Sequence, residues 1–241
     1  GIEGIIPQSA TGSYDVRDIL KEVFDDGLLT EIRKEWATNL VTSFATLGGH
    51  PVGVVANQPQ SLAGTLNIAA SQKGARFVSF CDAFNIPIIT FVDTPGFQPG
   101  KDLEWRGMIR HGAQLAFAYA QATVPRICVT LRKSYGGAYI VMDSKYMGND
   151  LSISWPSAEI AVMGAKGAVE ILHRKANEDE RSILEEEYEN RLLNPYMAAE
   201  RGSVDIVITP AETRRKVFAA LQPLLTKREK LQKRLHANTP L

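Results

Sequence analysis

The sequence has little cysteine, since Cys81 and Cys128 are the only two among its 241 residues. Two cysteines so far apart in the chain cannot form a disulfide framework or a cysteine-based metal site. We expect both to be buried, reduced thiols. This usage is typical of a reducing compartment, and we therefore expect a cytoplasmic protein.

The sequence also lacks an excess of charge and a long apolar run. Its 27 Lys and Arg balance 27 Asp and Glu, so no overall field would hold nucleic acid or an anionic membrane. The stretch 227–241 is basic, with five Lys or Arg against one Glu, and the rest of the chain is mildly acidic, with 22 basic against 26 acidic residues. The strongly apolar stretches, such as Ile86–Val92, fall well short of the roughly 20 residues that a membrane span needs. We expect neither nucleic acid nor a membrane as a partner.

The chain is long enough to bury a sizeable core. At about 100 to 200 residues per domain, its length allows one large domain or two small ones, and no clean internal boundary is visible. Residues 1–13 begin without Met and contain a Pro-Gln-Ser-Ala-Thr-Gly stretch that is typical of a linker. We expect a linker remnant over 1–13 and one domain over 14–241, cut from a longer protein.

The periodicity predicts alternating strands and helices. Short runs rich in Val and Ile, bounded by Gly, Pro or Asn, predict buried strands at 52–56, 86–92, 127–131, 151–154, 160–163 and 204–208. Apolar residues at helical spacing predict helices at 16–24, 69–84, 104–122 and 166–174. This alternation favours an α/β domain with mostly parallel strand pairing.

Two further helices are predicted near the end of the chain. The one at 177–193 is acidic, but apolar residues interleave and no His or Cys completes a ligand set, so we interpret it as a solvated helix face. The other runs from 211 to about 235 and has a basic end. We interpret it as a capped terminal helix, because cations are favourable at a helix C-terminus, and not as a nucleic-acid-binding arm.

One motif ends the predicted strand at 86–92, namely Asp93-Thr94-Pro95-Gly96. GTPases place a similar Asp-x-x-Gly near magnesium and the γ-phosphate. The phosphate-binding loop that should precede it, Gly-x-x-x-x-Gly-Lys-Ser/Thr, is absent from the sequence. We therefore interpret Asp93 as the cap of a turn that Pro95 and Gly96 shape.

A second motif, Tyr135-Gly136-Gly137-Ala138, follows the predicted strand at 127–131. Glycines between a strand and a helix leave backbone N–H groups unshielded, and a helix N-terminus adds partial positive charge, so two N–H groups here could hold an oxyanion. The alternative is that the glycines only permit a tight turn and close packing. No competing catalytic or metal motif occurs, and the four histidines are isolated in the sequence.

The motifs and their spacing resemble the C-terminal domain of the carboxyltransferase β subunit of biotin-dependent acyl-CoA carboxylases. The resemblance covers essentially the whole chain and rests on the segments 14–18, 57–59, 91–97, 112–120, 122–125, 135–139 and 155–164. It implies a crotonase-like α/β fold, in which ββα units form a spiral with extra C-terminal helices. It also implies that only half of a two-domain active site is present.

The resemblance assigns roles to particular residues. Gly137 and Ala138 would supply the N–H pair of an oxyanion hole, and Gly136 would permit the backbone approach. The carbonyl around Gly96 and Phe97 would contact the ureido N–H of biotin. The cofactor implied is carboxybiotin on a separate carrier domain, without a metal in this domain. The partners implied are an acyl-CoA, a biotin carboxylase or carrier subunit, and further copies in a dimer-built oligomer, expected to be a hexamer in the full-length protein.

The resemblance also bears on the acyl group. Ile140 and Tyr139 would line the acyl pocket, and Ile140 stands where propionyl-type members commonly carry Asp. We therefore expect a preference for acetyl-CoA, with malonyl-CoA as product and a role in fatty acid biosynthesis, and propionyl-CoA as the second candidate. Two alternatives stay open: a biotin-dependent decarboxylase or transcarboxylase subunit, and a non-catalytic assembly or carrier-docking domain.

Overall fold

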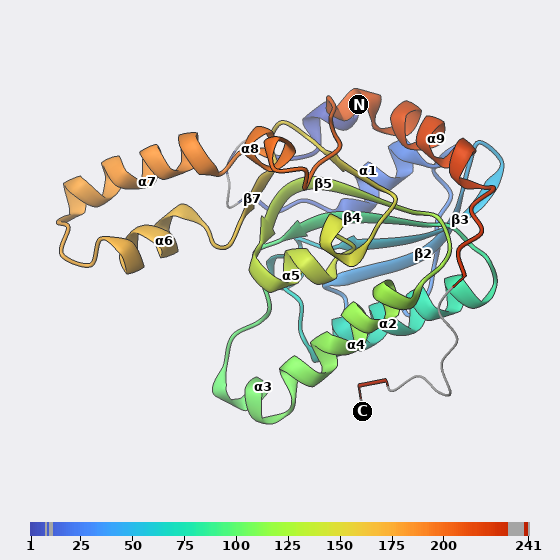
Figure 1. Ribbon diagram of the computed structural model, residues 1–241, viewed down its shortest axis with the longest axis horizontal. Coiled ribbons are helices and arrows are strands. Elements are labelled where there is room, and N and C mark those ends of the chain that lie inside the picture. The colour runs from blue at the N-terminus through green and yellow to red at the C-terminus, as the bar shows by residue number, and fades with distance from the viewer. Residues whose placement is uncertain (8, 10–11, 231–238, 241) are drawn as a thin grey trace.

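A mixed sheet of eight strands forms the centre of the computed structural model, which describes residues 1–7, 9, 12–230 and 239–240 (Figure 1). Its strands follow the order β1-β2-β3-β4-β5-β6-β8, and β7 also pairs with β5. Strands β1, β2 and β3 pair antiparallel to one another, and every later pairing is parallel. This confirms the predicted preference for parallel pairing. The bounds are β1 Thr30–Glu31, β2 Leu40–Leu47, β3 His50–Asn57, β4 Ile88–Thr94, β5 Arg126–Tyr135, β6 Leu151–Ser154, β7 Glu159–Ala161 and β8 Ile206–Val207.

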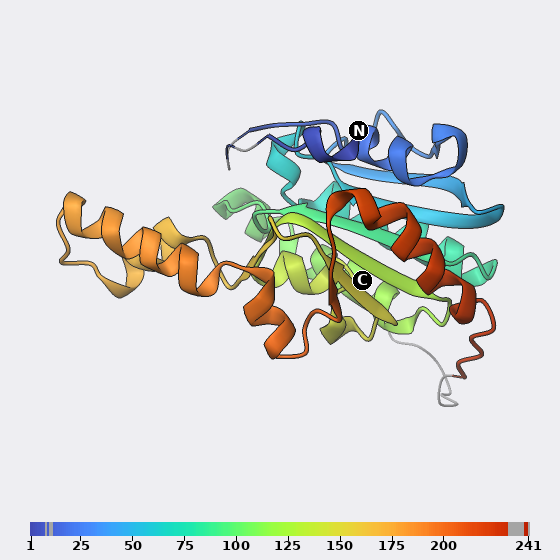
Figure 2. The same cartoon turned by 90° about the horizontal axis from the view of Figure 1, so that it is seen from above.

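Helices cover both faces of this sheet, with α1 and α9 on one face and α2 and α4 on the other (Figures 1 and 2). The helix bounds are α1 Val16–Val23, α2 Ile68–Ala83, α3 Lys101–Trp105, α4 Met108–Gln121, α5 Gly136–Val141, α6 Ala165–Leu172, α7 Glu178–Leu192, α8 Pro195–Glu200 and α9 Thr213–Leu224. Among the described helices, none combines the length and apolar character that crossing a bilayer requires.

The strand alternation divides the interior into two cores. Val54 and Phe91 point into the core under α1 and α9, whereas their neighbours Val55 and Val92 point into the core under α2 and α4. Successive side chains of a strand face opposite sides of a sheet, and both sides are buried here, so the strands are apolar throughout. Cys81 and Cys128 are free thiols buried in the second core, as predicted.

The predicted strands are all found, but β1 and β2 were not predicted. β2 contains the polar residues Thr42 and Ser43, which are buried within the sheet. The Thr42 hydroxyl donates to the Ile32 carbonyl, and the Ser43 hydroxyl to the Phe44 carbonyl. Because these hydroxyls are satisfied internally, a strand that looks only moderately apolar in sequence can still be buried.

Two helix predictions were wrong in extent. The helix predicted at 104–122 is interrupted, because Gly107 adopts a left-handed conformation (φ +86°) between α3 and α4. The terminal helix ends at Leu224, so the basic run from Lys227 is not its capped C-terminus; the predicted part at 231–235 lies outside the described residues. Lys227 instead forms an ion pair with Asp150, with 3.0 Å between Nζ and Oδ2.

Helices α6 and α7 form an arm that projects from the body of the molecule (Figures 1 and 2). Helix α7 begins with a capping box between Asn177 and Glu180, and none of its residues is buried. The prediction of a solvated acidic helix is confirmed. Its apolar side chains are also exposed, and Ile183 keeps 60% of its surface accessible.

Asp25 joins the end of α1 to two distant segments. Its carboxylate accepts hydrogen bonds from the N–H groups of Gly48 and Gly49, at 3.0 and 2.8 Å, and from the guanidinium of Arg214 at 2.5 Å. The Gly49 N–H, followed by Arg214, lowers the pKa of Asp25 below its usual value. A carboxyl whose pKa is lower in the folded state stabilises the fold above about pH 4 and loses that contribution as the pH falls.

We expect Asp25→Asn to lower the free energy of unfolding at pH 7 by about 1 kcal/mol, which is the scale of a partly exposed charged hydrogen bond. The difference between the variant and the native protein should be constant above about pH 4 and should shrink progressively as the pH is lowered from about 4 towards about 2, because protonation then removes the same charge. Thermal unfolding at several pH values measures this. Asp26→Asn is the control, since Asp26 is exposed and makes no hydrogen bond within the described residues. A constant difference between the variant and the native protein at all pH values would contradict the assignment.

Candidate active site

The junction between β5 and α5 holds the glycine motif. Gly136 turns the chain with a φ of +59°, which side chains rarely adopt, and a Cβ there would lie 3.1 Å from the Val162 carbonyl oxygen. The N–H groups of Gly137 and Ala138 lie in the first turn of α5, where a helix provides no internal acceptor. No side chain caps this end of the helix. Neither N–H group therefore has an acceptor within its own helix, and Gly137 is exposed whereas Ala138 is fully buried.

A second backbone segment is pinned next to this junction. Leu66 forms a parallel bridge to Phe97, in which the Leu66 N–H donates to the Gly96 carbonyl and the Gln98 N–H donates to the Leu66 carbonyl, at 3.0 and 2.8 Å. In a parallel bridge, the residue between the two that bond to the partner segment directs its own N–H and C=O away from that segment. Here that residue is Phe97, between Gly96 and Gln98. The Gly96 carbonyl is thus occupied, and the Phe97 carbonyl faces away from Leu66.

The two predicted parts of the site meet at the Phe97 ring. A Cβ built on Gly137 would lie 3.6 Å from this ring, and one on Gly112 of α4 would lie only 3.1 Å from it. Phe97 follows β4 and Gly137 follows β5, and these strands are parallel neighbours. The structure therefore brings together the predicted carbonyl segment and the predicted N–H pair at the carboxyl ends of two adjacent strands.

A cavity of about 420 Å³ opens beside Gly137, and neither Ala138 nor Phe97 is among its described lining residues. Four predicted residues line it: Gly136, Gly137, Tyr139 and Ile140. Ile140 is 40% exposed, whereas Tyr139 is largely buried, and burial raises the pKa of its phenol. The far wall, from β7 and α8 and the end of α7, was not predicted and includes Ile160, Ala161, Val162, Leu192, Met197, Ala198, Arg201 and Ser203.

Asp93 lies near the end of β4, and the prediction that it caps a turn was wrong. It is a buried residue within β4, and its carboxylate accepts bonds from the Tyr14 hydroxyl at 2.8 Å, Arg132 Nε at 3.1 Å and the Lys133 N–H at 3.1 Å. The neighbouring Thr94 hydroxyl, not Asp93, bonds with the Gly96 backbone. Burial raises the pKa of Asp93, and the Arg132 guanidinium opposes that rise.

The Asp93–Arg132 ion pair also anchors the start of the chain. Arg132 Nη1 donates to the carbonyl oxygens of Ser9 and Gly12, at 3.4 and 2.8 Å, and its guanidinium lies 5.2 Å from the centre of the Tyr14 ring. Arg132 belongs to β5, a few residues before Gly136. The carboxyl ends of β4 and β5 and the segment before Tyr14 are therefore held by one buried charged cluster.

The end of β5 carries one further polar contact. The Tyr135 hydroxyl donates to the Glu159 carboxylate of β7, and burial together with this contact raises the pKa of Tyr135. It ties β7 to the β5–α5 junction. Among the described residues, no group of three or more His, Cys, Asp and Glu side chains is arranged to hold a metal ion.

Comparisons with known proteins now place this site in a family. The family model for the carboxyl transferase domain matches residues 1–239, and the chain belongs to this family. The propionyl-CoA carboxylase beta chain of Saccharopolyspora erythraea is 50% identical over all of this chain and 46% of its own length. A biotin-dependent acetyl-/propionyl-coenzyme A carboxylase beta5 subunit of Mycobacterium tuberculosis is also 50% identical, over 45% of its length.

A solved structure agrees with the fold. The transcarboxylase 12S crystal structure, described as a hexamer with methylmalonyl-coenzyme A and methylmalonic acid bound, has a TM-score of 0.97 and 49% identity, over the whole of this chain and 47% of its own. The fold is thus the crotonase-like α/β architecture that the family resemblance implied. The chain spans about half the length of the relatives it matches.

The comparisons also correct one expectation. The relatives include several propionyl-CoA carboxylase beta chains. They do not support the acetyl-CoA preference inferred from Ile140, nor the malonyl-CoA product and the role in fatty acid biosynthesis that followed from it. A single cavity residue shifts selectivity by only about 1 to 3 kcal/mol, so it could not outweigh the rest of the chain.

Proposed function

We propose that this chain is the biotin-side half of a carboxyltransferase, which moves a carboxyl group from carboxybiotin to the α-carbon of a short-chain acyl-CoA. The observation that carries the proposal is the proximity of Gly137 to the Phe97 ring, with Gly137 lining the cavity and Ala138 following it in the first turn of α5. Such a site provides an acceptor for a ureido N–H and two donors for an oxyanion.

The residues of the site act by position and by electrostatics. Carboxybiotin supplies the carboxyl group and, through its ureido group, a base for the α-proton. The Phe97 carbonyl orients that ureido group by accepting its N–H. The N–H groups of Gly137 and Ala138 donate to one of the two oxygens that gain negative charge, the ureido oxygen or the thioester oxygen. Donors fixed in advance at such an oxygen are among the largest contributions to catalysis.

Propionyl-CoA is the acceptor that the relatives favour, with acetyl-CoA as the second candidate. The apolar side of the cavity, which includes Ile140 and Ile160, suits a short alkyl group. The 12S hexamer suggests further copies of the protein, and the biotin-dependent relatives suggest a biotin-carrying partner. A transcarboxylase subunit is a second candidate function, supported by the likeness to the 12S structure. The identity of the biotin-carrying partner and of the carboxyl donor would distinguish the two.

We expect Ile140→Asp in the full-length protein to raise the ratio of kcat/KM for propionyl-CoA over acetyl-CoA by about 10-fold, because Asp is the residue that propionyl-type members of the family commonly carry at this position. Ile140 lines the cavity and is 40% exposed, so the substitution changes the lining without burying an unpaired charge. Steady-state carboxylation rates with both substrates measure the ratio. Ile109→Asp is a matched control, because Ile109 is exposed on α4 and does not line the cavity. An unchanged ratio would show that Ile140 does not contact the acyl group.

The test of the proposed function is decarboxylation of a malonyl-type CoA thioester in the presence of free biotin. We expect no turnover by this chain alone, and turnover when the N-terminal half of the parent protein is added. The reason is that, in the proposed two-part site, most of the surface that binds the acyl-CoA lies outside this chain, although Ile140 contacts the acyl group. Turnover by the chain alone would contradict the two-part site, and no turnover by the complete protein would contradict the proposed function.

A further inference from the structure

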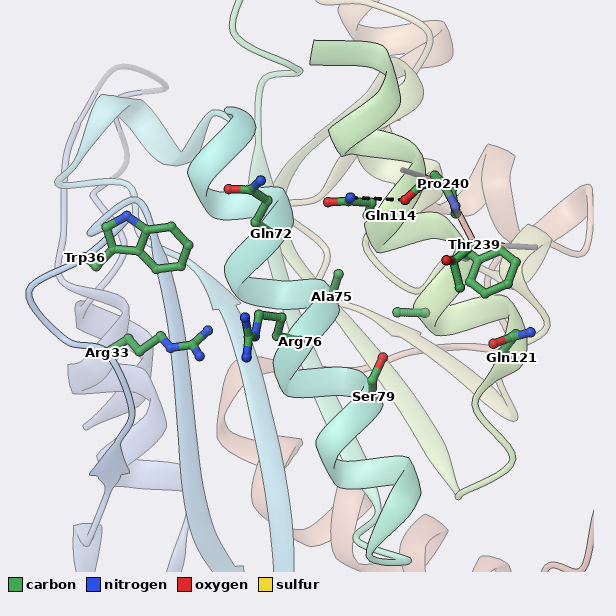
Figure 3. A pocket seen from close by; sticks show the side chains of 12 residues that line it. Arg33, Trp36, Gln72, Ala75, Arg76, Ser79, Gln114, Gln121, Thr239 and Pro240 are labelled. Atoms are coloured by element: carbon green, nitrogen blue, oxygen red, sulfur yellow. Dashed lines mark hydrogen bonds between the residues drawn. The ribbon is translucent and has the colours of Figure 1, made fainter. Parts of the chain in front are cut away.

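A second pocket of about 700 Å³ lies between the loop at 33–36 and helices α2 and α4 (Figure 3). It shares no lining residue with the cavity at α5. Its volume is in the range of small-molecule sites, roughly 300 to 1,000 Å³. Its lining includes Arg33 and Trp36 from the loop, Gln72 and Arg76 from α2, and Gln114 from α4. The proposed carboxyl transfer does not use this pocket.

Two arginines give the pocket its charge. Figure 3 shows the guanidinium groups of Arg33 and Arg76 pointing toward one another from opposite sides of the pocket. Neither has a hydrogen bond or an ion pair within the described part of the chain, and no Asp or Glu is among the described lining residues. Two facing cations without a counter-ion repel each other, and guanidinium pairs are well suited to bind a phosphate group.

An aromatic side chain stands beside these cations. The Trp36 indole is 41% exposed, and the Arg33 guanidinium lies 5.7 Å from the centre of its ring. The loop that carries it is fixed by the buried Lys73, whose ammonium group donates to the carbonyl oxygens of Trp36, Ala37 and Leu40, at 2.9, 3.3 and 2.6 Å. An exposed indole on a fixed loop provides a surface on which a planar base can stack.

Carboxamides line the α2 and α4 sides of the pocket. The Gln114 amide donates to the Pro240 carbonyl at 3.2 Å, and its side-chain oxygen lies 3.3 Å from His111 Nδ1, which leaves its second N–H for another partner. Gln72 bonds to the ring of His111 at 3.2 Å through its amide nitrogen. A carboxamide both donates and accepts, so it can pair with the polar edge of a base.

We propose that this pocket binds a nucleoside phosphate, with the phosphate groups between Arg33 and Arg76 and the base against Trp36. Each feature of the pocket matches one part of such a ligand: the cations match the phosphates, the indole matches the base plane, and the carboxamides match the base edge. The pocket is separate from the cavity at α5, so nucleotide binding here does not depend on the proposed function.

The test is calorimetric titration of the full-length protein with ADP, with coenzyme A present at saturation so that an acyl-CoA site is already filled. We expect one saturable binding event, weakened at least 10-fold by Arg33→Gln and by Arg76→Gln, and weakened also by Trp36→Ala. Both arginines are exposed and unbonded, so these variants should fold. Arg110→Gln is the control, since Arg110 is an exposed arginine of α4 outside the pocket.

Three results would overturn the proposal. The first is the absence of saturable ADP binding. The second is ADP binding that Arg33→Gln and Arg76→Gln leave unchanged, which would place the nucleotide elsewhere. The third is inorganic phosphate binding as tightly as ADP, because the indole and the carboxamides would then contribute nothing and the pocket would be a simple anion site.

Discussion

Replacement of Gly136 by Ala is expected to lower kcat of the full-length protein about 10²- to 10³-fold, the usual loss when one oxyanion donor is removed. The added Cβ would meet the Val162 carbonyl oxygen at 3.1 Å, and the φ of +59° is unfavourable for Ala. The chain must shift at the point where it aims the Gly137 and Ala138 N–H groups. Carboxylation of the acyl-CoA measures kcat directly.

Gly49→Ala provides the matched control. Gly49 also has a positive φ, of +81°, but a Cβ there meets nothing within 4 Å. The two variants should therefore lose similar backbone stability, on the order of 1 kcal/mol, while only Gly136→Ala loses activity. Equal kcat values for the two variants would show that the β5–α5 junction does not aim a catalytic donor.

Replacement of Asp93 by Ala is expected to lower the free energy of unfolding by about 3 to 5 kcal/mol, because it leaves the Arg132 guanidinium buried without a counter-charge. The substitution also removes the acceptor of the Tyr14 hydroxyl and the Lys133 N–H. Urea unfolding followed by circular dichroism measures the loss. The double variant Asp93→Ala/Arg132→Met should be more stable than the single one, since no unpaired charge remains.

Asp102→Ala is the control for an ion pair that is not buried. Asp102 pairs with Arg106 at 3.3 Å, but both side chains are mostly exposed, so its loss should change stability by less than about 1 kcal/mol. A similar small change for Asp93→Ala would mean that the buried cluster does not hold β4, β5 and the start of the chain together.

The sequence predicted the parallel part of the sheet well because those strands are buried on both faces. Runs of Val and Ile such as those in β3 and β4 then appear directly in the sequence. β2 escaped prediction because its buried hydroxyls are satisfied by local carbonyls, which periodicity does not reveal. The break at Gly107 was not predicted, because a single glycine within an apolar helical pattern is compatible with either a continuous or an interrupted helix.

The candidate site was predictable only in part. The glycine motif and the Phe97 segment each follow a predicted strand, but their proximity depends on β4 and β5 being neighbours, which spacing alone does not determine. The wall formed by α8 was not predicted, because this short helix lacks a clear apolar period. Asp93 was interpreted as a turn cap because its partners, Tyr14 and Arg132, are far from it in the sequence.

The two walls of the cavity at α5 differ in how firmly they are packed against the rest of the molecule. One wall is the β5–α5 junction, which is embedded in the sheet and both cores, whereas the other includes Leu192 at the end of an arm in which α7 buries no residue. Segments with few buried contacts open locally at a free energy far below that of global unfolding. Amide hydrogens of α7 should thus exchange with solvent long before those of β5. An acyl group bound in the cavity would slow exchange mainly around Leu192, because this wall is the less firmly packed of the two.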